Sequence, residues 1–136
     1  MGRNLGVGAV VSRVIAAPVD AVWRVFTDRT RRAGWVADPV ADARLCLTVV
    51  EPFRRCVIGL ALGSGPRRTY VFAPVAVGVH RGGTVVSVVE DRGTADRIFD
   101  LVSGGFVART VEGAVRAELA ALAAACTTRV ISATAA

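Results

Sequence analysis

The sequence predicts an α+β fold, in which a long C-terminal helix lies on an antiparallel sheet. Apolar residues alternate with polar ones in several short runs, which is typical of half-buried strands. In the last third of the chain they recur every three or four residues, which indicates one long helix. Strands and helices do not alternate along the chain, which argues against a parallel βαβ architecture. The 136 residues match the usual size of one domain, so we expect a single domain over 1–136.

The first part of the chain predicts a strand and two helices. Residues 8–16 are rich in Val and Ile and indicate the first strand. A helix over 18–28 follows, with a proline in its first turn. Four apolar side chains share one face of this helix: Val19, Val22, Trp23 and Phe26. Asp28 ends the helix in a turn. A second short helix is expected over 29–35, before Gly34 and Pro39 break it.

Four further strands are expected as an antiparallel meander: residues 44–50, 55–62, 67–73 and 84–90. The first two form a hairpin around a turn at 51–54. One register pairs their apolar residues: Leu45 with Leu60, Leu47 with Ile58, and Val49 with Cys56. Both apolar sets then lie on one face of the hairpin, which we expect to be buried.

Residues 103–128 predict the long C-terminal helix, of about seven turns. Its apolar stripe is expected to face the sheet: Val107, Val111, Val115, Leu119, Leu122 and Cys126. A second face carries only small residues: Gly113, Ala117, Ala120 and Ala124. This small-residue face offers a contact surface for a homodimer.

Composition argues against several classes of protein. The net charge of +6 comes from 17 scattered arginines, a pattern that suits a GC-rich genome better than a nucleic-acid surface. Three cysteines and one histidine, without a C-x-x-C, argue against a disulfide framework and a zinc site. We therefore expect buried free thiols, no metal and no cofactor. We find neither an uncharged stretch of membrane-spanning length nor a secretory signal, and expect a cytoplasmic protein.

Several short strings occur in an order typical of one family. They are the strand-to-helix entry at 14–23, Thr27-Asp28, Gly34-Trp35, the hairpin 51–55 (EPFRR) and Gly83-Thr84. With the long terminal helix, they resemble the START-like, or Bet v 1-like (SRPBCC), helix-grip superfamily, and most of all its polyketide cyclase/dehydrase-type branch. The resemblance covers nearly the whole chain. Its motifs are structural, so it implies a fold more than a reaction.

The resemblance implies a curved antiparallel sheet wrapped on the terminal helix, with two short helices after the first strand. That family usually has seven strands, whereas this chain shows five, and the shortfall follows Trp35. We therefore expect a smaller sheet, a more open pocket, or an edge completed by a second subunit.

The same arrangement implies a cavity between sheet and helix for a mostly apolar small molecule. We expect ten side chains to line it: Leu47, Ile58, Leu60, Val86 and Val88 as the floor, Phe106, Val107 and Val111 as the lid, Trp35 at the rim, and Tyr70 as a polar anchor. The alternative is that these side chains fill the gap, because protein interiors normally pack without voids.

Catalytic motifs are scarce, since G-x-S-x-G, H-E-x-x-H, P-loop and G-x-G-x-x-G strings are absent. Four side chains are acid–base candidates: Asp38, Tyr70, His80 and Glu90. His80 fits either a solvent-facing turn or a general acid or base at the cavity mouth. Glu90 and Asp91, with Asp96 and Asp100 beyond, are expected in a solvated loop and helix start.

These observations favour a protein that binds a small hydrophobic, lipid- or polyketide-like molecule. A polyketide cyclase or aromatase is one alternative, because a shaped cavity can hold a reactive chain for ring closure. A START-like toxin or interaction module is another, because the charge of +6 would suit a ribosomal surface.

Overall fold

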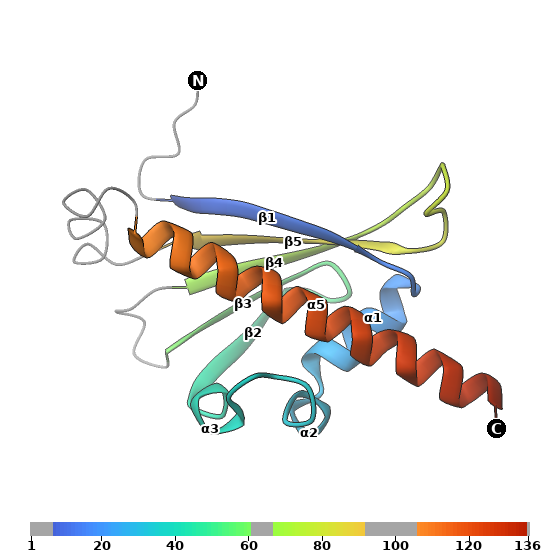
Figure 1. Ribbon diagram of the computed structural model, residues 1–136, viewed down its shortest axis with the longest axis horizontal. Coiled ribbons are helices and arrows are strands. Elements are labelled where there is room, and N and C mark those ends of the chain that lie inside the picture. The colour runs from blue at the N-terminus through green and yellow to red at the C-terminus, as the bar shows by residue number, and fades with distance from the viewer. Residues whose placement is uncertain (1–6, 61–66, 92–105, 136) are drawn as a thin grey trace.

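The computed structural model describes residues 7–60, 67–91 and 106–135, and the side chains of most of them. Its elements are β1 (Val7–Ile15), α1 (Val19–Thr27), α2 (Arg29–Arg32), α3 (Pro39–Asp42), β2 (Leu45–Glu51), β3 (Arg55–Leu60), β4 (Arg67–Pro74), β5 (Thr84–Asp91) and α5 (Phe106–Ala135). The strands form one antiparallel sheet in the order β1-β5-β4-β3-β2, and α5 runs diagonally across it (Figure 1). The predicted fold class is confirmed: a curved sheet, a long C-terminal helix and short helices after the first strand.

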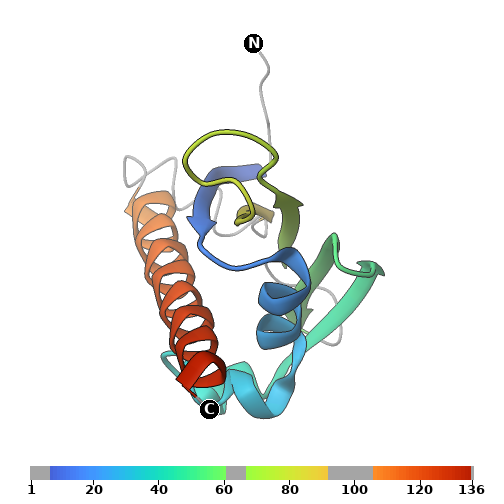
Figure 2. The same ribbon diagram turned by 90° about the vertical axis from the view of Figure 1, so that its right-hand side faces the viewer.

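The core lies between the sheet and the two longer helices. Figure 2 shows α5 on one side of this interior and α1 on the other. Helix α1 inserts two aromatic rings beside two rings of β4, with ring centroids 4.6 Å apart for Phe26 and Tyr70 and 5.1 Å apart for Trp23 and Phe72. Helix α5 contributes four buried residues of the predicted stripe: Val115, Leu119, Leu122 and Cys126. The side chains of its first two predicted members, Val107 and Val111, lie outside the described residues.

The predicted hairpin register is confirmed at all three apolar pairs of β2 and β3. Ile58 and Cys56 are buried, and Leu45 and Leu47 pack against the core. Val49 differs from the prediction, because 47% of its surface is exposed. Leu45 and Leu47 share this face of β2 and pack against the core, so Val49 lies beyond the part of the face that other elements cover.

The segment between α1 and β2 holds one more helix than expected. Asp28 ends α1, as predicted, and also begins α2, because its carboxylate accepts hydrogen bonds from the backbone N–H groups of Thr30 and Arg31. Pro39 begins α3 rather than only breaking a helix. Asp38 caps α3 by accepting from Ala41 N at 3.0 Å. An aspartate followed by proline is a helix start signal, which explains why a helix begins at Pro39.

The start of β5 is tied to the turn between β1 and α1. Thr84 Oγ1 donates to the carbonyl of Ala17 at 2.7 Å, and Thr84 is fully buried. Beside it, a Cβ on Gly83 would lie 2.8 Å from the carbonyl oxygen of Ile15, closer than any side chain could be held. Gly83-Thr84 is therefore a structural joint between the sheet and the first helix.

Over the described residues, the sheet has five strands, with β1 and β2 at its two edges. In the part of the chain that the structure describes, no helix is long and apolar enough to cross a membrane.

Candidate functional site

A pocket of about 350 Å³ opens between α5 and the sheet, at the end where β4 begins and β5 ends. Eight described residues line it: Arg32, Leu45, Ile58, Gly59, Arg68, Tyr70, Glu90 and Glu118. They come from α2, all of β2 to β5, and α5. The pocket is more polar than the sequence predicts, because five of its lining side chains are ionisable.

Strand β4 places Arg68 and Tyr70 on the inner face of the sheet, since residues two apart share a face. The Tyr70 hydroxyl donates to Glu118 Oε1 at 2.5 Å, across the gap to α5. Burial raises the pKa of Tyr70 well above its ordinary value, and the charge of Glu118 raises it further, while Arg68 opposes the rise. The phenol is therefore a neutral hydrogen-bond donor at physiological pH.

Arg68 bridges two carboxylates. Its Nε lies 3.3 Å from Glu90 Oε2 on the paired strand, and its Nη1 lies 3.4 Å from Glu118 Oε1.

The expectation that Glu90 lies in a solvated loop is wrong. Strand β5 continues to Asp91, and its alternation turns Glu90 inward with Val86 and Val88, so that only 6% of Glu90 is exposed.

One carboxylate oxygen of Glu90 lacks a hydrogen-bond donor. Glu90 Oε1 is buried and has no hydrogen-bond partner. Such an orphaned acceptor is costly in a folded interior, because water no longer hydrates it. It is the clearest chemical feature of the pocket.

Arg32, the last residue of α2, also lines the pocket. It forms a bidentate pair with Asp42, with Nε–Oδ2 at 3.0 Å and Nη2–Oδ1 at 2.6 Å, and lies 3.6 Å from Glu118 Oε2. Its guanidinium also stacks on the rings of Phe26 and Trp35. Burial disfavours the charge of Arg32, but the hydrogen bond and charge of Asp42 outweigh this and raise its pKa. Arg32 is thus held permanently charged, although only 3% of it is exposed.

These contacts join α2, α3, α5, β4 and β5 in one ionic network, which we call the Glu118 network: Arg32, Asp42, Arg68, Tyr70, Glu90 and Glu118. The sequence analysis singled out Tyr70 and Glu90 and missed the rest. A signal for Glu118 existed, because this charge borders the apolar stripe of the long helix, next to Leu119 and three residues after Val115. A charge at the border of a buried face calls for a partner inside.

The ten predicted lining residues divide into three groups. Ile58 and Tyr70 line the pocket. Leu47 borders a much smaller neighbouring hollow, and Val86 and Val88 are buried in the core. The ring of Trp35 stacks on the Arg32 guanidinium, and its indole N–H is buried without a hydrogen-bond partner. The remaining four side chains lie outside the described residues: Leu60, Phe106, Val107 and Val111. The predicted ligand contacts stay predictions.

The four acid–base candidates do not form one site. Tyr70 and Glu90 face the same pocket. Asp38 caps α3 instead, and His80 is exposed in the turn between β4 and β5, at the opposite end of β4 from Arg68. Asp91 ends β5, and Asp96 and Asp100 lie outside the described residues.

A second hollow of about 380 Å³ lies at the His80 end, between the start of α1 and the β2–β3 turn. Phe53 forms part of it with a left-handed backbone, at φ 62°, and packs on Trp23. Its charged lining side chains, Asp20 and Arg54, are 59% and 69% exposed. Because exposed charges remain hydrated, this hollow lacks the buried polar chemistry of the first pocket.

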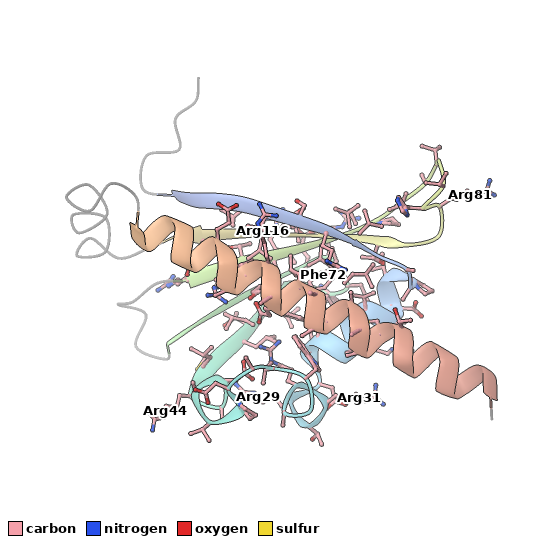
Figure 3. All side chains as sticks on the ribbon, viewed as in Figure 1. Arg29, Arg31, Arg44, Phe72, Arg81 and Arg116 are labelled. Carbon is pink, nitrogen blue, oxygen red and sulfur yellow. The ribbon has the colours of Figure 1, made fainter. Side chains whose placement is uncertain are left out.

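The outer surface carries no concentrated basic patch over the described residues. Figure 3 shows Arg29 and Arg31 on α2, whereas Arg44 precedes β2, Arg81 lies in the turn between β4 and β5, and Arg116 lies on α5. Seven described arginines pair with carboxylates: Arg24, Arg31, Arg32, Arg54, Arg55, Arg68 and Arg116. This spread gives no support to a nucleic-acid surface.

Two other surface predictions have mixed outcomes. The small residues of α5 are exposed, as a contact face requires: Gly113, Ala117, Ala120 and Ala124. The expectation of buried thiols holds for Cys56 and Cys126 and is wrong for Cys46, which points outward from the edge strand β2. Burial raises the pKa of the Cys56 thiol to about 12.

Neither a protein-family model nor a curated protein matches the chain. Solved structures do. The chain is similar to protein NE0264 from Nitrosomonas europaea, with a TM-score of 0.65 and 13% identity over 94% of this chain and 98% of that one. It is also similar to protein Ms6760 from Mycobacterium smegmatis, with a TM-score of 0.60 and 16% identity over 88% and 90% of the two chains.

A third similar structure is DynU16, a protein in the dynemicin biosynthetic locus. Its TM-score is 0.58 and its identity 21%, and the match covers 87% of this chain but 46% of DynU16, so this chain spans less than half of that protein. At these identities the likenesses establish the fold alone.

Proposed function

We propose that this protein binds a small molecule with an apolar body and a polar end in the pocket under α5. The carrying observation is that a space of about 350 Å³ adjoins Leu45 and Ile58 on one side and the Glu118 network on the other. Ligand pockets typically begin at roughly 300 Å³ and combine apolar walls with a few placed polar groups. The pocket is open to solvent on one side, so a ligand can enter it and contact both the apolar wall and the buried polar groups.

We further propose that the chain is a START-like protein of the polyketide cyclase/dehydrase-type branch. The sheet order and the crossing helix support this, together with the Gly83-Thr84 joint and the EPFRR hairpin. A lipid- or polyketide-like molecule would suit the apolar wall of the pocket.

A cyclase- or aromatase-type enzyme is a second candidate, favoured by one contact. The Tyr70–Glu118 hydrogen bond at 2.5 Å puts a neutral donor and a carboxylate at the same pocket. Such a pair could orient a carbonyl and accept or return a proton during ring closure. The enzyme hypothesis expects Tyr70→Phe and Glu118→Gln to abolish turnover of the natural ligand and to leave its binding within a few-fold.

Two measurements test the binding proposal. Native mass spectrometry of the purified protein, repeated after denaturation, should reveal a co-purifying molecule that unfolding releases. Separately, N-phenyl-1-naphthylamine, a neutral fluorophore that brightens in apolar surroundings, should bind saturably to one site.

A pocket-filling variant gives the decisive comparison. Leu45→Trp adds an indole to the pocket wall and should abolish fluorophore binding. Val40→Trp is the matched control, because Val40 is 70% exposed on α3 and does not line the pocket. Equal binding by both variants and the wild type, without a co-purifying molecule, would refute the pocket as a binding site.

A further inference from the structure

The Glu118 network contains one more carboxylate than it can neutralise. Its acids are Asp42, Glu90 and Glu118, and its bases are Arg32 and Arg68. Arg32 is committed to Asp42 by two short contacts. Arg68 is then shared between Glu90 and Glu118, at 3.3 and 3.4 Å, so it balances only one of them. Within the described network, one negative charge is left without a counter-charge in a largely buried setting.

Hydrogen bonding locates this surplus at Glu90. Glu118 Oε1 receives the Tyr70 hydroxyl and an Arg68 N–H, and its Oε2 faces Arg32. Among the described residues, Glu90 has one polar side-chain contact, from Arg68 to Oε2, and its Oε1 has no hydrogen-bond partner. Glu90 is 94% buried, lines the pocket and comes from the neighbouring strand. The pocket therefore presents an acceptor that no described donor satisfies.

The described side-chain donors that line the pocket, on Arg32, Arg68 and Tyr70, each have a partner. The Tyr70 hydroxyl points to Glu118, and Arg32 donates to Asp42 and to the carbonyl of Phe26. An anionic ligand would meet this surplus negative charge, and both arginines among the described lining residues are already paired with carboxylates. A cationic group would restore the charge balance and supply the missing donor.

We propose that the pocket selects ligands whose polar end is a cationic group, such as a protonated amine, received by Glu90. This inference rests on the proposed binding function and adds the chemical class of the ligand. The apolar body would lie along Leu45 and Ile58, and the ammonium would approach the Glu90 carboxylate.

The test compares three probes that differ only at one end: octylamine, octanol and octanoate, each titrated calorimetrically at neutral pH. Octylamine should bind at least about tenfold more tightly than octanol, as a charge-assisted hydrogen bond implies, and octanoate should bind most weakly. The protein's net charge of +6 works in the opposite direction, since it attracts anions. A preference for the amine would therefore have to come from the pocket.

The Glu90→Gln variant tests whether the preference for octylamine over octanol comes from the Glu90 carboxylate. It keeps the shape of the side chain and should bring octylamine to within about twofold of octanol. Glu112→Gln is the matched control, because it removes the same charge from the outer face of α5, where Glu112 pairs with Arg116, and should leave the preference intact.

The outcomes separate the two proposals. If octanol or octanoate binds as well as octylamine, the inference fails while the pocket stands as a binding site. If none of the three probes binds, the inference fails, and if N-phenyl-1-naphthylamine also fails to bind, the proposed binding function fails with it. The wild-type order of the probes needs no variant, so a Glu90→Gln protein that does not fold leaves the main test in place.

Discussion

Replacing Arg32 with methionine removes a buried guanidinium and keeps a side chain of similar length. The structure predicts a large loss of stability. Asp42 would lose a bidentate partner and Glu118 a counter-charge at 3.6 Å, while the carbonyl of Phe26 would lose its donor at 3.2 Å. Breaking a buried ion pair on one side costs about 3–5 kcal/mol, because the remaining charge stays buried. The Asp42 and Glu118 side chains are 18% and 15% exposed, so water can reach them in part, and we expect about 3 kcal/mol.

The assay is urea unfolding, followed by the fluorescence of the two tryptophans. Arg31→Met is the matched control, because the neighbouring Arg31 pairs with Asp28 while both side chains are about 40% exposed. An exposed pair contributes about 0–1 kcal/mol, so the control should stay close to the wild type. The double variant Arg32→Met/Asp42→Leu should recover part of the loss, since it also removes the stranded carboxylate. If Arg32→Met costs no more than Arg31→Met, the buried ion pair does not have the structural role assigned to it.

Three further predictions follow from single contacts. Gly83→Ala should lower the free energy of unfolding by about 1–3 kcal/mol, because the new methyl group would clash with backbone oxygens. Gly113→Ala, in open space on α5, should raise it by about 0.5–1 kcal/mol. Equal effects of the two variants in thermal unfolding would contradict the close approach of Gly83 to the Ile15 carbonyl. Burial raises the pKa of Tyr70 above its value in the unfolded chain. The stability that the neutral phenol contributes is therefore complete below about pH 10 and is lost at higher pH. The free energy of urea unfolding should accordingly fall less steeply at alkaline pH for Tyr70→Phe than for the wild type. A disulfide reagent should modify Cys46 in the native protein and the buried Cys56 only after unfolding, and equally fast modification of both would show that β3 is not covered.

The regular elements could be predicted because their signals are local. The two-residue period of β2 and β3 and the turn between them determined even the register of the hairpin. The helical period likewise identified the stripe that α5 buries against the sheet. The errors arose where a local signal had two readings. Pro39 could stop a helix or start one, and Val49 belongs to a face that is buried only where other elements cover it.

The sequence by itself determined the fold class, the order of the elements and which apolar faces turn inward, because these depend on spacing along the chain. Only the tertiary structure decided the chemistry of the pocket. Tyr70 and Glu118 are 48 positions apart, and Arg68 and Glu90 are 22 apart. A charged residue carries no periodic signal that names its partner, because ion pairing depends on distance in space and on burial. The surplus carboxylate at Glu90 exists only once α2, α3, β4, β5 and α5 have come together around one pocket.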